Sequence, residues 1–283
     1  MINSKTYGLQ TETRQYLRRL YSYGRELNSS DVADIDNFIK GLKQFNLLQN
    51  IIVYPLRSQY NLGTGANVLS FGGIGKFDGL MINGPSWGLS GINFTAASSQ
   101  YIRIPNFLNN PVVAGFSMIC LHQPDFTTTG RALLANDGAT ATTRGMRINV
   151  QAHSYIGFNA NNLFVSFGTS PSDGTSAGSR IYSTFNTANM HINYVSFGGA
   201  LASGMSASIN QTTSTGSISV PSFFNTSFST MGIGARNGAT GSGDYFQGTM
   251  ALMMIANRPI SPVEYLNIYD LIKTTIGKGL SLP

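Results

Sequence analysis

Carboxylates are sparse in the part of this chain where hydrolytic chemistry would need them in pairs. Hydrolysis of a sugar chain uses two carboxylates roughly 5–10 Å apart, a spacing that adjacent positions on one face of a strand can supply. Between residues 47 and 263 there is no glutamate, and the five aspartates stand far apart in sequence: Asp78, Asp125, Asp137, Asp173 and Asp244. We therefore expect no hydrolytic centre of this kind and, more broadly, no enzyme.

Histidine and cysteine offer no better arrangement for catalysis. His122, His153 and His191 stand alone, without a second ligand at the spacing of a metal site. Cys120, the single cysteine, lies in the apolar run 116–121 and is predicted to be a small buried side chain. No G-x-S-x-G motif is present, and we expect no cofactor.

Two loops carry oxygen ligands that calcium could use. They are Asn136-Asp137-Gly138 and Ser172-Asp173-Gly174. Asp-Gly pairs are first of all turn formers, because they tolerate the backbone angles of tight turns. We therefore predict turns at both loops, with calcium binding as the alternative.

The composition excludes several other classes. Charged residues make up 11% of the 283 residues, against about 25% in typical domains, so Ser, Thr, Asn, Gln and Gly must cover the surface. The net charge of +6 invites a nucleic-acid interpretation, but the basic cluster between residues 14 and 43 also holds four acidic residues, and no basic stripe with interleaved aromatics follows it. A nucleic-acid partner is not expected. No apolar run is long enough to span a bilayer, and the N-terminus lacks the apolar region of a signal peptide, so we expect no membrane partner.

The first 46 residues are predicted to form a helical hairpin. One amphipathic helix covers about 9–27, and a second runs from a cap at Ser30 to about residue 45. Their apolar stripe must be buried on the remainder of the chain or on another copy of it. The candidate assembly residues of this stripe are Tyr16, Leu20, Tyr23, Ile35, Phe38 and Ile39.

From residue 47 the pattern changes to short β-branched and aromatic runs separated by Gly, Asn, Ser and Thr, which is typical of a sandwich. The chain closes with a predicted strand near 246–254 and a helix. Ser261, Pro262 and Glu264 form a capping-box start, and we take the helix's apolar face as Val263, Leu266, Tyr269 and Ile272.

The closing segment resembles the last strand and helix of laminin-G-like, concanavalin A-like jelly rolls. The matching positions are Phe246, Gly248, Asn257, Arg258, Ile260, Ser261, Glu264 and Tyr269. Segments 91–94, 100–105, 116–121, 131–138 and 231–236 resemble earlier strands of that family in the same order. The resemblance implies a mainly β fold: an antiparallel concanavalin A-like sandwich over 47–283, preceded by the helical hairpin of 1–46 and ending in a short helix.

The resemblance also implies a function, because lectin-like sandwiches behind short helical adaptors are frequent in bacteriophage particles. We expect a non-enzymatic virion component, such as a tail, fibre or capsid-attached protein. It would contact other virion proteins and copies of itself through the hairpin. The alternatives are a carbohydrate-binding module for bacterial surface glycans and, less favoured, a glycan-active enzyme. Sugar sites combine aromatic platforms with loop amides, and the candidates here are Trp87, Asn161, Asn162 and Tyr245.

Overall fold

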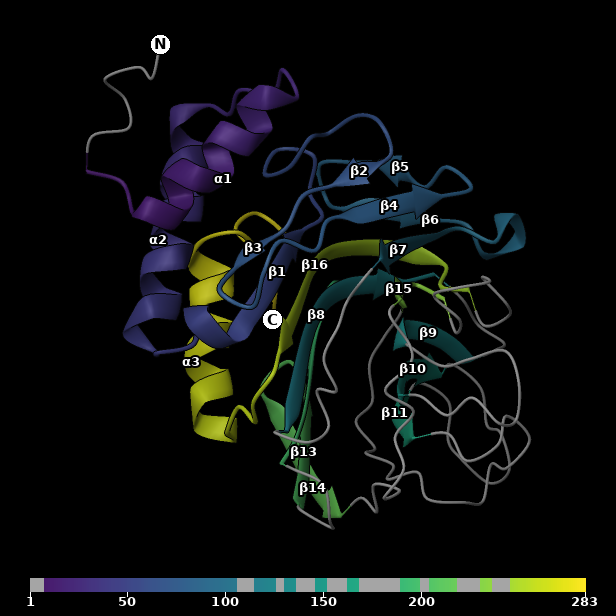
Figure 1. Cartoon of the computed structure of the whole chain (residues 1–283). Coiled ribbons are helices and arrows are strands. Elements are labelled where there is room, and N and C mark those ends of the chain that lie inside the picture. The colour runs from purple at the N-terminus through teal and green to yellow at the C-terminus, as the bar shows by residue number, and fades with distance from the viewer. Residues whose placement is uncertain are drawn as a thin grey trace.

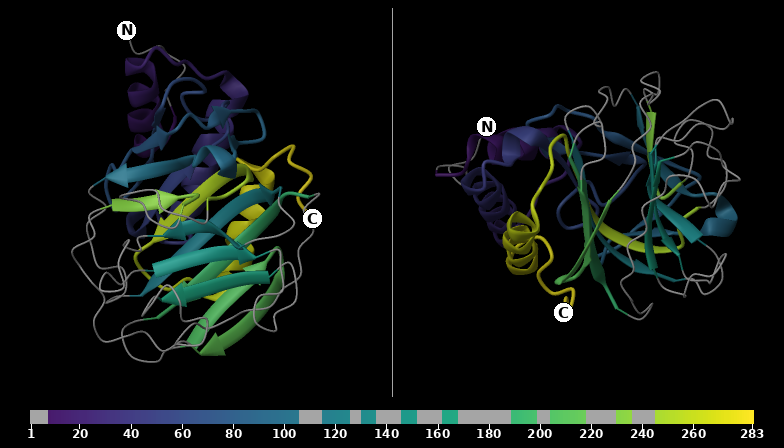
Figure 2. Two further views of the ribbon diagram at one scale, coloured as in Figure 1. Left: turned by 90° about the vertical axis from the view of Figure 1, so that its right-hand side faces the viewer. Right: turned by 90° about the horizontal axis from the view of Figure 1, so that it is seen from below.

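A computed structural model of the chain describes residues 8–105, 115–125, 130–135, 146–151, 162–167, 189–198, 204–217, 230–235 and 245–283. In these residues two β-sheets lie face to face (Figure 1). Helices cover the outer side of one sheet, as the view from below shows best (Figure 2).

Two of the three described α-helices begin at side-chain caps. The three are α1 (Thr11–Ser22), α2 (Ser29–Gln44) and α3 (Pro262–Thr274), with short 3-10 turns at Leu48–Asn50 and Ala96–Ser98. Asn28 caps α2, where the sequence predicted Ser30, because the Asn28 side-chain oxygen accepts a hydrogen bond from the Asp31 amide at 2.8 Å. The predicted capping box of α3 is confirmed, since Ser261 and Glu264 each accept a hydrogen bond from the other's backbone amide.

The apolar face predicted for α3 is wrong at two positions. Val263 is 71% exposed and Leu266 is 39% exposed. A second stripe at helical spacing, one that also contains Tyr269 and Ile272, turns toward the sheet instead because it carries the larger aromatic area. Its buried members are Tyr265, Ile268, Tyr269 and Ile272.

The first sheet contains nine described strands, all paired antiparallel. Their order is β14-β13-β12-β8-β16-β1-β3, with β6 also paired to β16 and β5 to β6. Their bounds are β1 Ile51–Pro55, β3 Phe71–Gly72, β5 Ser86–Trp87, β6 Ile92–Phe94, β8 Phe116–Pro124, β12 His191–Phe197, β13 Gly204–Ile209, β14 Thr212–Ser217 and β16 Gly248–Ala256.

The second sheet contains seven described strands, also antiparallel. Their order is β11-β10-β9-β15-β7-β4-β2. Their bounds are β2 Asn67–Val68, β4 Gly79–Ile82, β7 Tyr101–Pro105, β9 Gly130–Ala135, β10 Met146–Gln151, β11 Asn162–Phe167 and β15 Thr230–Ile233.

Strand alternation divides the apolar residues between two layers. In β1, Ile52 and Tyr54 face the space between the sheets, whereas Ile51 and Val53 face the helices. All five residues of β1 are buried, because this strand is covered on both faces. Cys120 belongs to the inter-sheet layer, which confirms the predicted buried cysteine.

The apolar stripe of the hairpin packs on the sandwich, the first of the two partners that its sequence allowed. Tyr16, Leu20, Ile35, Phe38 and Ile39 are at most 1% exposed and share one apolar cluster with the outer face of β1, β8 and β16. Tyr23 is 55% exposed. An assembly role of the hairpin stays a prediction. These five side chains are enclosed within the chain itself, so such a role would fall on the hairpin's outer face.

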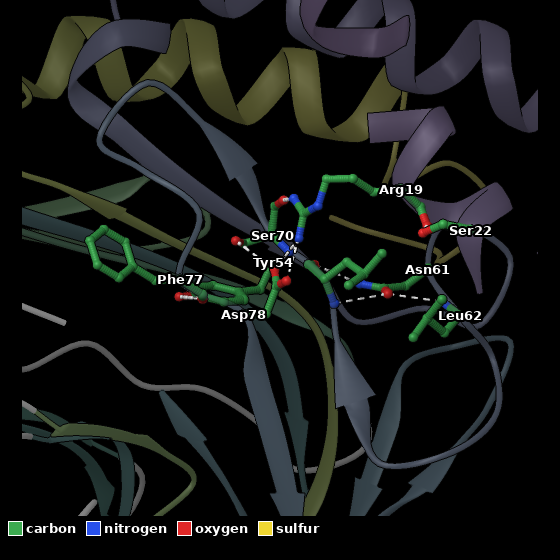
Figure 3. Close-up of polar contacts among 9 residues, drawn as sticks. Arg19, Ser22, Tyr54, Asn61, Leu62, Ser70, Phe77 and Asp78 are labelled. Atoms are coloured by element: carbon green, nitrogen blue, oxygen red, sulfur yellow. Dashed lines mark hydrogen bonds and ion pairs between the residues drawn. The ribbon is translucent and has the colours of Figure 1, made fainter. Parts of the chain in front are cut away.

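Polar contacts also join the hairpin to the sandwich. The Arg19 guanidinium on α1 donates to the Ser70 carbonyl at 2.5 Å and forms an ion pair with Asp78 (Figure 3). The Tyr16 hydroxyl donates to the Tyr60 carbonyl at 2.8 Å. Although the predicted boundary at residue 46 falls between α2 and β1, the two parts share both apolar and polar contacts.

A buried asparagine holds the segment that receives the hairpin. The Asn61 amide nitrogen donates to the carbonyls of Pro55 and Leu69, each at 2.8 Å. Its oxygen accepts from the amides of Leu62 and Leu69 at 2.8 and 3.1 Å (Figure 3). All four bonds lie in the interior, so this loop is a rigid base for α1. Two antiparallel sheets, an N-terminal helix pair and a short C-terminal helix confirm the predicted fold class.

Candidate functional site

The structure does not bring the predicted glycan-binding residues together. Trp87 lies on β5 of the first sheet, partly buried, and its indole nitrogen donates to the Gly65 carbonyl at 3.0 Å. Tyr245 precedes β16 and packs beside Tyr101 of the second sheet. Asn162 begins β11 at the far edge of that sheet, four strand positions away from β7, and Asn161 lies outside the described residues.

Tyr245 instead identifies a different site, on the outer face of the second sheet at β7. Ile102 and Ile104 of β7 point into the inter-sheet core, so the alternating residues Tyr101 and Arg103 face outward. The tyrosine rings of 101 and 245 lie 6.3 Å apart between centroids, at 41°. Two phenols and one guanidinium therefore share this face.

Backbone contacts of β15 place Tyr245 there. The Phe246 amide donates to the Gly234 carbonyl at 2.8 Å, and the Gly234 amide donates to the Leu133 carbonyl at 3.0 Å. Gly234 has φ +82°, a conformation that L side chains rarely adopt. Its position follows β15, which pairs with β7. The bond from Phe246 to Gly234 holds the residue after Tyr245 beside the end of β15, and Tyr245 lies against Tyr101 of the neighbouring β7.

The start of β7 is held by a side-chain network. The Gln100 amide oxygen accepts from the Thr95 amide at 2.7 Å, and its nitrogen donates to the carbonyls of Asn83 and Gly84 at 3.1 Å each. The Asn83 side chain donates to the Ser99 carbonyl at 2.9 Å. Two loops from different parts of the chain are thus fixed against the residue that precedes Tyr101, and the site stands on an ordered base.

Arg103 carries a charge that the described residues do not neutralise. Its Nε atom is buried without a hydrogen-bond partner, and no described carboxylate forms an ion pair with it. Burial raises the pKa of the Tyr101 phenol, the Arg103 charge opposes that rise, and Tyr245 adds to it. These effects show that the guanidinium and the two phenols lie within electrostatic reach of one another. The phenol groups likewise have no described hydrogen-bond partner.

The buried histidines form part of the core. The cross-strand pair His122 and His191 stands on β8 and β12, which confirms them as strand residues. The Asn193 amide nitrogen donates to His122 Nε2 at 2.7 Å. Burial lowers the pKa of His122 to about 3, with a further lowering by His191 and an opposing effect of Asn193. Burial also raises the pKa of the Cys120 thiol, so neither residue is poised for proton transfer at neutral pH.

No described residues assemble a metal site or a pair of catalytic acids near β7. Asp78 is engaged by Arg19, and a group of three metal-ligating side chains is absent from the part of the chain that the structure describes. Both predicted calcium or turn loops, 136–138 and 172–174, and His153 lie outside the described residues. Among the described helices, none has the length and hydropathy required to cross a bilayer.

Comparison with known proteins finds similar folds at low identity. No family model matches the chain, and no curated protein does. Among solved structures, the chain is similar to the binding module of a Ruminococcus gnavus sialidase bound to α2,3-sialyllactose, with 11% identity over 56% of this chain and 84% of that one (TM-score 0.42). It is also similar to domain 4 of a Geobacillus stearothermophilus arabinanase in complex with arabinotriose, with 14% identity over 78% and 87% (TM-score 0.43).

A third similar structure is the botulinum neurotoxin serotype C1 binding domain, at 10% identity and TM-score 0.49. The match covers 79% of this chain but only 52% of the toxin domain, so the chain spans about half of that domain's length. At these TM-scores and identities, the similar structures do not indicate which ligand the present chain binds.

The sequence already held the signal for the site that it did not identify. In Tyr101-Ile102-Arg103-Ile104 the apolar residues alternate with an aromatic and a cation. Alternation places Tyr101 and Arg103 together on the solvent side of a half-buried strand. An arginine on such a face with no acidic residue nearby in sequence was the available clue. That Tyr245 joins it depends on the path of the chain after β15.

Proposed function

We propose that this chain is a carbohydrate-binding module whose binding surface is the outer face of the second sheet around Tyr101, Arg103 and Tyr245. The observation that carries the proposal is the convergence of two phenols and a guanidinium without partners among the described residues. Sugar rings offer hydroxyl groups for such donors and apolar faces for aromatic rings. The site has binding groups and lacks, in the described residues, the acid pair that hydrolysis would need.

The virion-component interpretation receives no comparable support. It was motivated by the lone cysteine, the lack of a signal peptide, the low-charge surface and an anchor-like helical arm, and five of the six stripe residues of that arm are buried against the chain's own sheet. Assembly with virion proteins, a virion location and the lack of enzymatic activity therefore stay predictions. A carbohydrate-binding module is also compatible with a role in contacting a host surface.

The test is direct binding of the full chain to an array of bacterial surface polysaccharides and oligosaccharides, followed by titration of the strongest ligand. Tyr245→Ala removes one phenol and part of the aromatic surface, and we expect it to weaken binding at least tenfold. Tyr21→Ala is the matched control, because Tyr21 is a 67% exposed tyrosine on α1; it should bind as the wild type does. The proposal fails if the array shows no binding above background, or if Tyr245→Ala binds as tightly as the control.

A further inference from the structure

The described arginines differ in what their guanidinium groups contact. Most of them donate to a side-chain or backbone oxygen of the chain itself: Arg14 to Thr11, Arg19 to Ser70 and Asp78, Arg25 to Ser58, Arg57 to Leu89, Ile276, Lys278 and Gln59, and Arg258 to Pro259 and Glu264. The Nε atoms of Arg25 and Arg103 are both buried without a partner among the described residues, but Arg25 still donates to Ser58, whereas no described oxygen accepts a hydrogen bond from the guanidinium of the partly buried Arg103. A partly desolvated cation without a partner is costly to the folded protein. That cost points to a partner from outside.

The register of the sheet shows why the neighbouring described strands supply no partner for the Arg103 guanidinium. Its cross-strand neighbours are Leu80 on β4 and Gly232 on β15. Leu80 is apolar and Gly232 has no side chain, so neither can neutralise the charge. On the same strand and face, Tyr101 contributes a phenol, which can only add a neutral hydrogen bond.

The same cross-strand row contains a second arginine position. From Gly232 the register leads to Ala135 on β9, then to Arg147 on β10 and Ser166 on β11. With strands about 4.8 Å apart, the α-carbons of Arg103 and Arg147 are separated by three strand spacings, roughly 14 Å. The row holds two basic positions and no acidic one. In the backbone register, no carboxylate position therefore stands opposite Arg103 along this row.

We propose that the glycan bound at this face carries a carboxylate, which Arg103 receives between the phenols of Tyr101 and Tyr245. The inference rests on the proposed function and names the class of sugar that the site selects. A planar guanidinium presents paired donors that match the two oxygens of a carboxylate. A neutral sugar at the same place would leave the guanidinium uncompensated. The acidic sugar of a uronate- or sialate-containing chain supplies the missing partner.

The experiment compares matched glycans that differ only in charge. The probes are immobilised oligogalacturonides and sialylated oligosaccharides, each beside its carboxyl-reduced counterpart, with sulfated oligosaccharides as a third set. The full chain is expected to bind an acidic member at least tenfold more tightly than its reduced counterpart. Arg103→Gln should abolish that preference, and Arg103→Lys should keep part of it, because the charge remains and the paired donors are lost. Arg14→Gln is the control, since this arginine makes only an exposed contact with Thr11. Thermal unfolding of every variant checks that it is folded.

The outcomes separate the inference from the proposed function. Equal binding to an acidic glycan and its reduced counterpart would overturn the carboxylate inference and leave glycan binding intact. So would an acidic preference that survives Arg103→Gln in a folded variant. A preference for the sulfated set over the carboxylated one would also overturn it. Absence of binding to every probe and to the wider array would contradict the proposed function itself.

Discussion

The two outer faces of the sandwich use similar residues for different purposes. The outer face of the first sheet is closed by α1, α2 and α3, and its apolar side chains merge with theirs into one cluster. On the second sheet no described α-helix covers the outer face, where Leu80, Ile82 and Arg103 of β4 and β7 are partly exposed and Tyr101 is 5% exposed. The first face is thus covered by helices, whereas the second keeps Leu80, Ile82 and Arg103 partly exposed in the described residues.

The two faces differ in how their arginines are paired. Arg19 reaches from a helix to a carbonyl and a carboxylate of the sandwich, so its charge is neutralised within the protein. Arg103 stands on a strand beside Leu80, Gly232 and Tyr101, and no described residue forms an ion pair or hydrogen bond with its guanidinium. A charge compensated internally contributes to folding, whereas an uncompensated one on an organised face is a feature of binding sites. The following substitutions test that distinction.

The largest effect is expected from truncating matched leucines on the two faces. Leu20→Ala removes a side chain with 0% exposure at the contact between α1 and the first sheet, and should lower the free energy of unfolding by about 3 kcal/mol or more. Leu80→Ala removes a partly exposed side chain from the open face and should cost about 1 kcal/mol or less. Urea unfolding measures both. Equal losses would mean that the second face is packed as tightly as the first.

The next effect concerns Asn61, in the loop of the sandwich on which the hairpin packs. Asn61→Ala removes four interior hydrogen bonds, and we expect a loss of about 3 kcal/mol in the free energy of unfolding, since each such bond contributes roughly 0.5–1.5 kcal/mol. Asn67→Ala, at an exposed position of β2, is the control and should change stability by less than about 0.5 kcal/mol. A small effect of Asn61→Ala would contradict the role of this loop as a rigid support.

The buried histidine His122 on β8 should make the free energy of unfolding depend on pH. His122 has its pKa lowered to about 3 by burial, whereas an unfolded histidine titrates near pH 6.5. Between these values the unfolded chain binds more protons, so the free energy of unfolding should fall as the pH falls below 6.5, by roughly 1.4 kcal/mol per pH unit. Urea unfolding at pH 7, 6 and 5 measures the slope. His122→Gln should flatten it, and identical slopes in both proteins would count against the buried neutral histidine.

The smallest expected effects come from replacing Arg19 and Arg103, and they compare the two faces directly. Arg19→Gln removes a partly exposed ion pair and a hydrogen bond to Ser70, and should cost about 1 kcal/mol. Arg103→Gln removes a charge without a described internal partner, so we expect a change within about 0.5 kcal/mol or a slight gain in stability. Thermal unfolding of the two variants side by side gives the comparison. A clear loss for Arg103→Gln would show that the arginine has a structural role instead.

Much of the fold could be predicted from local patterns. The capping residues Ser261 and Glu264 lie within one turn of each other, and the alternation of β7 is complete within five residues. Predictions failed where two local solutions competed: Asn28 and Ser30 were both able to cap α2, and two apolar stripes of α3 shared Tyr269 and Ile272. For α2, the hydrogen bond of Asn28 at 2.8 Å decides the cap. For α3, burial against the sheet decides which stripe faces inward.

By itself, the sequence determined the order of helical hairpin, sandwich and closing helix, the burial of Cys120 and the scarcity of paired acids, because periodicity, capping and composition depend on residues close together in the chain. Only the tertiary structure decided that the hairpin's stripe is covered by its own sandwich. It also decided that Tyr245 joins Tyr101 and that Leu80 and Gly232 flank Arg103. These contacts follow from strand order and register, which bring together residues that no local pattern connects.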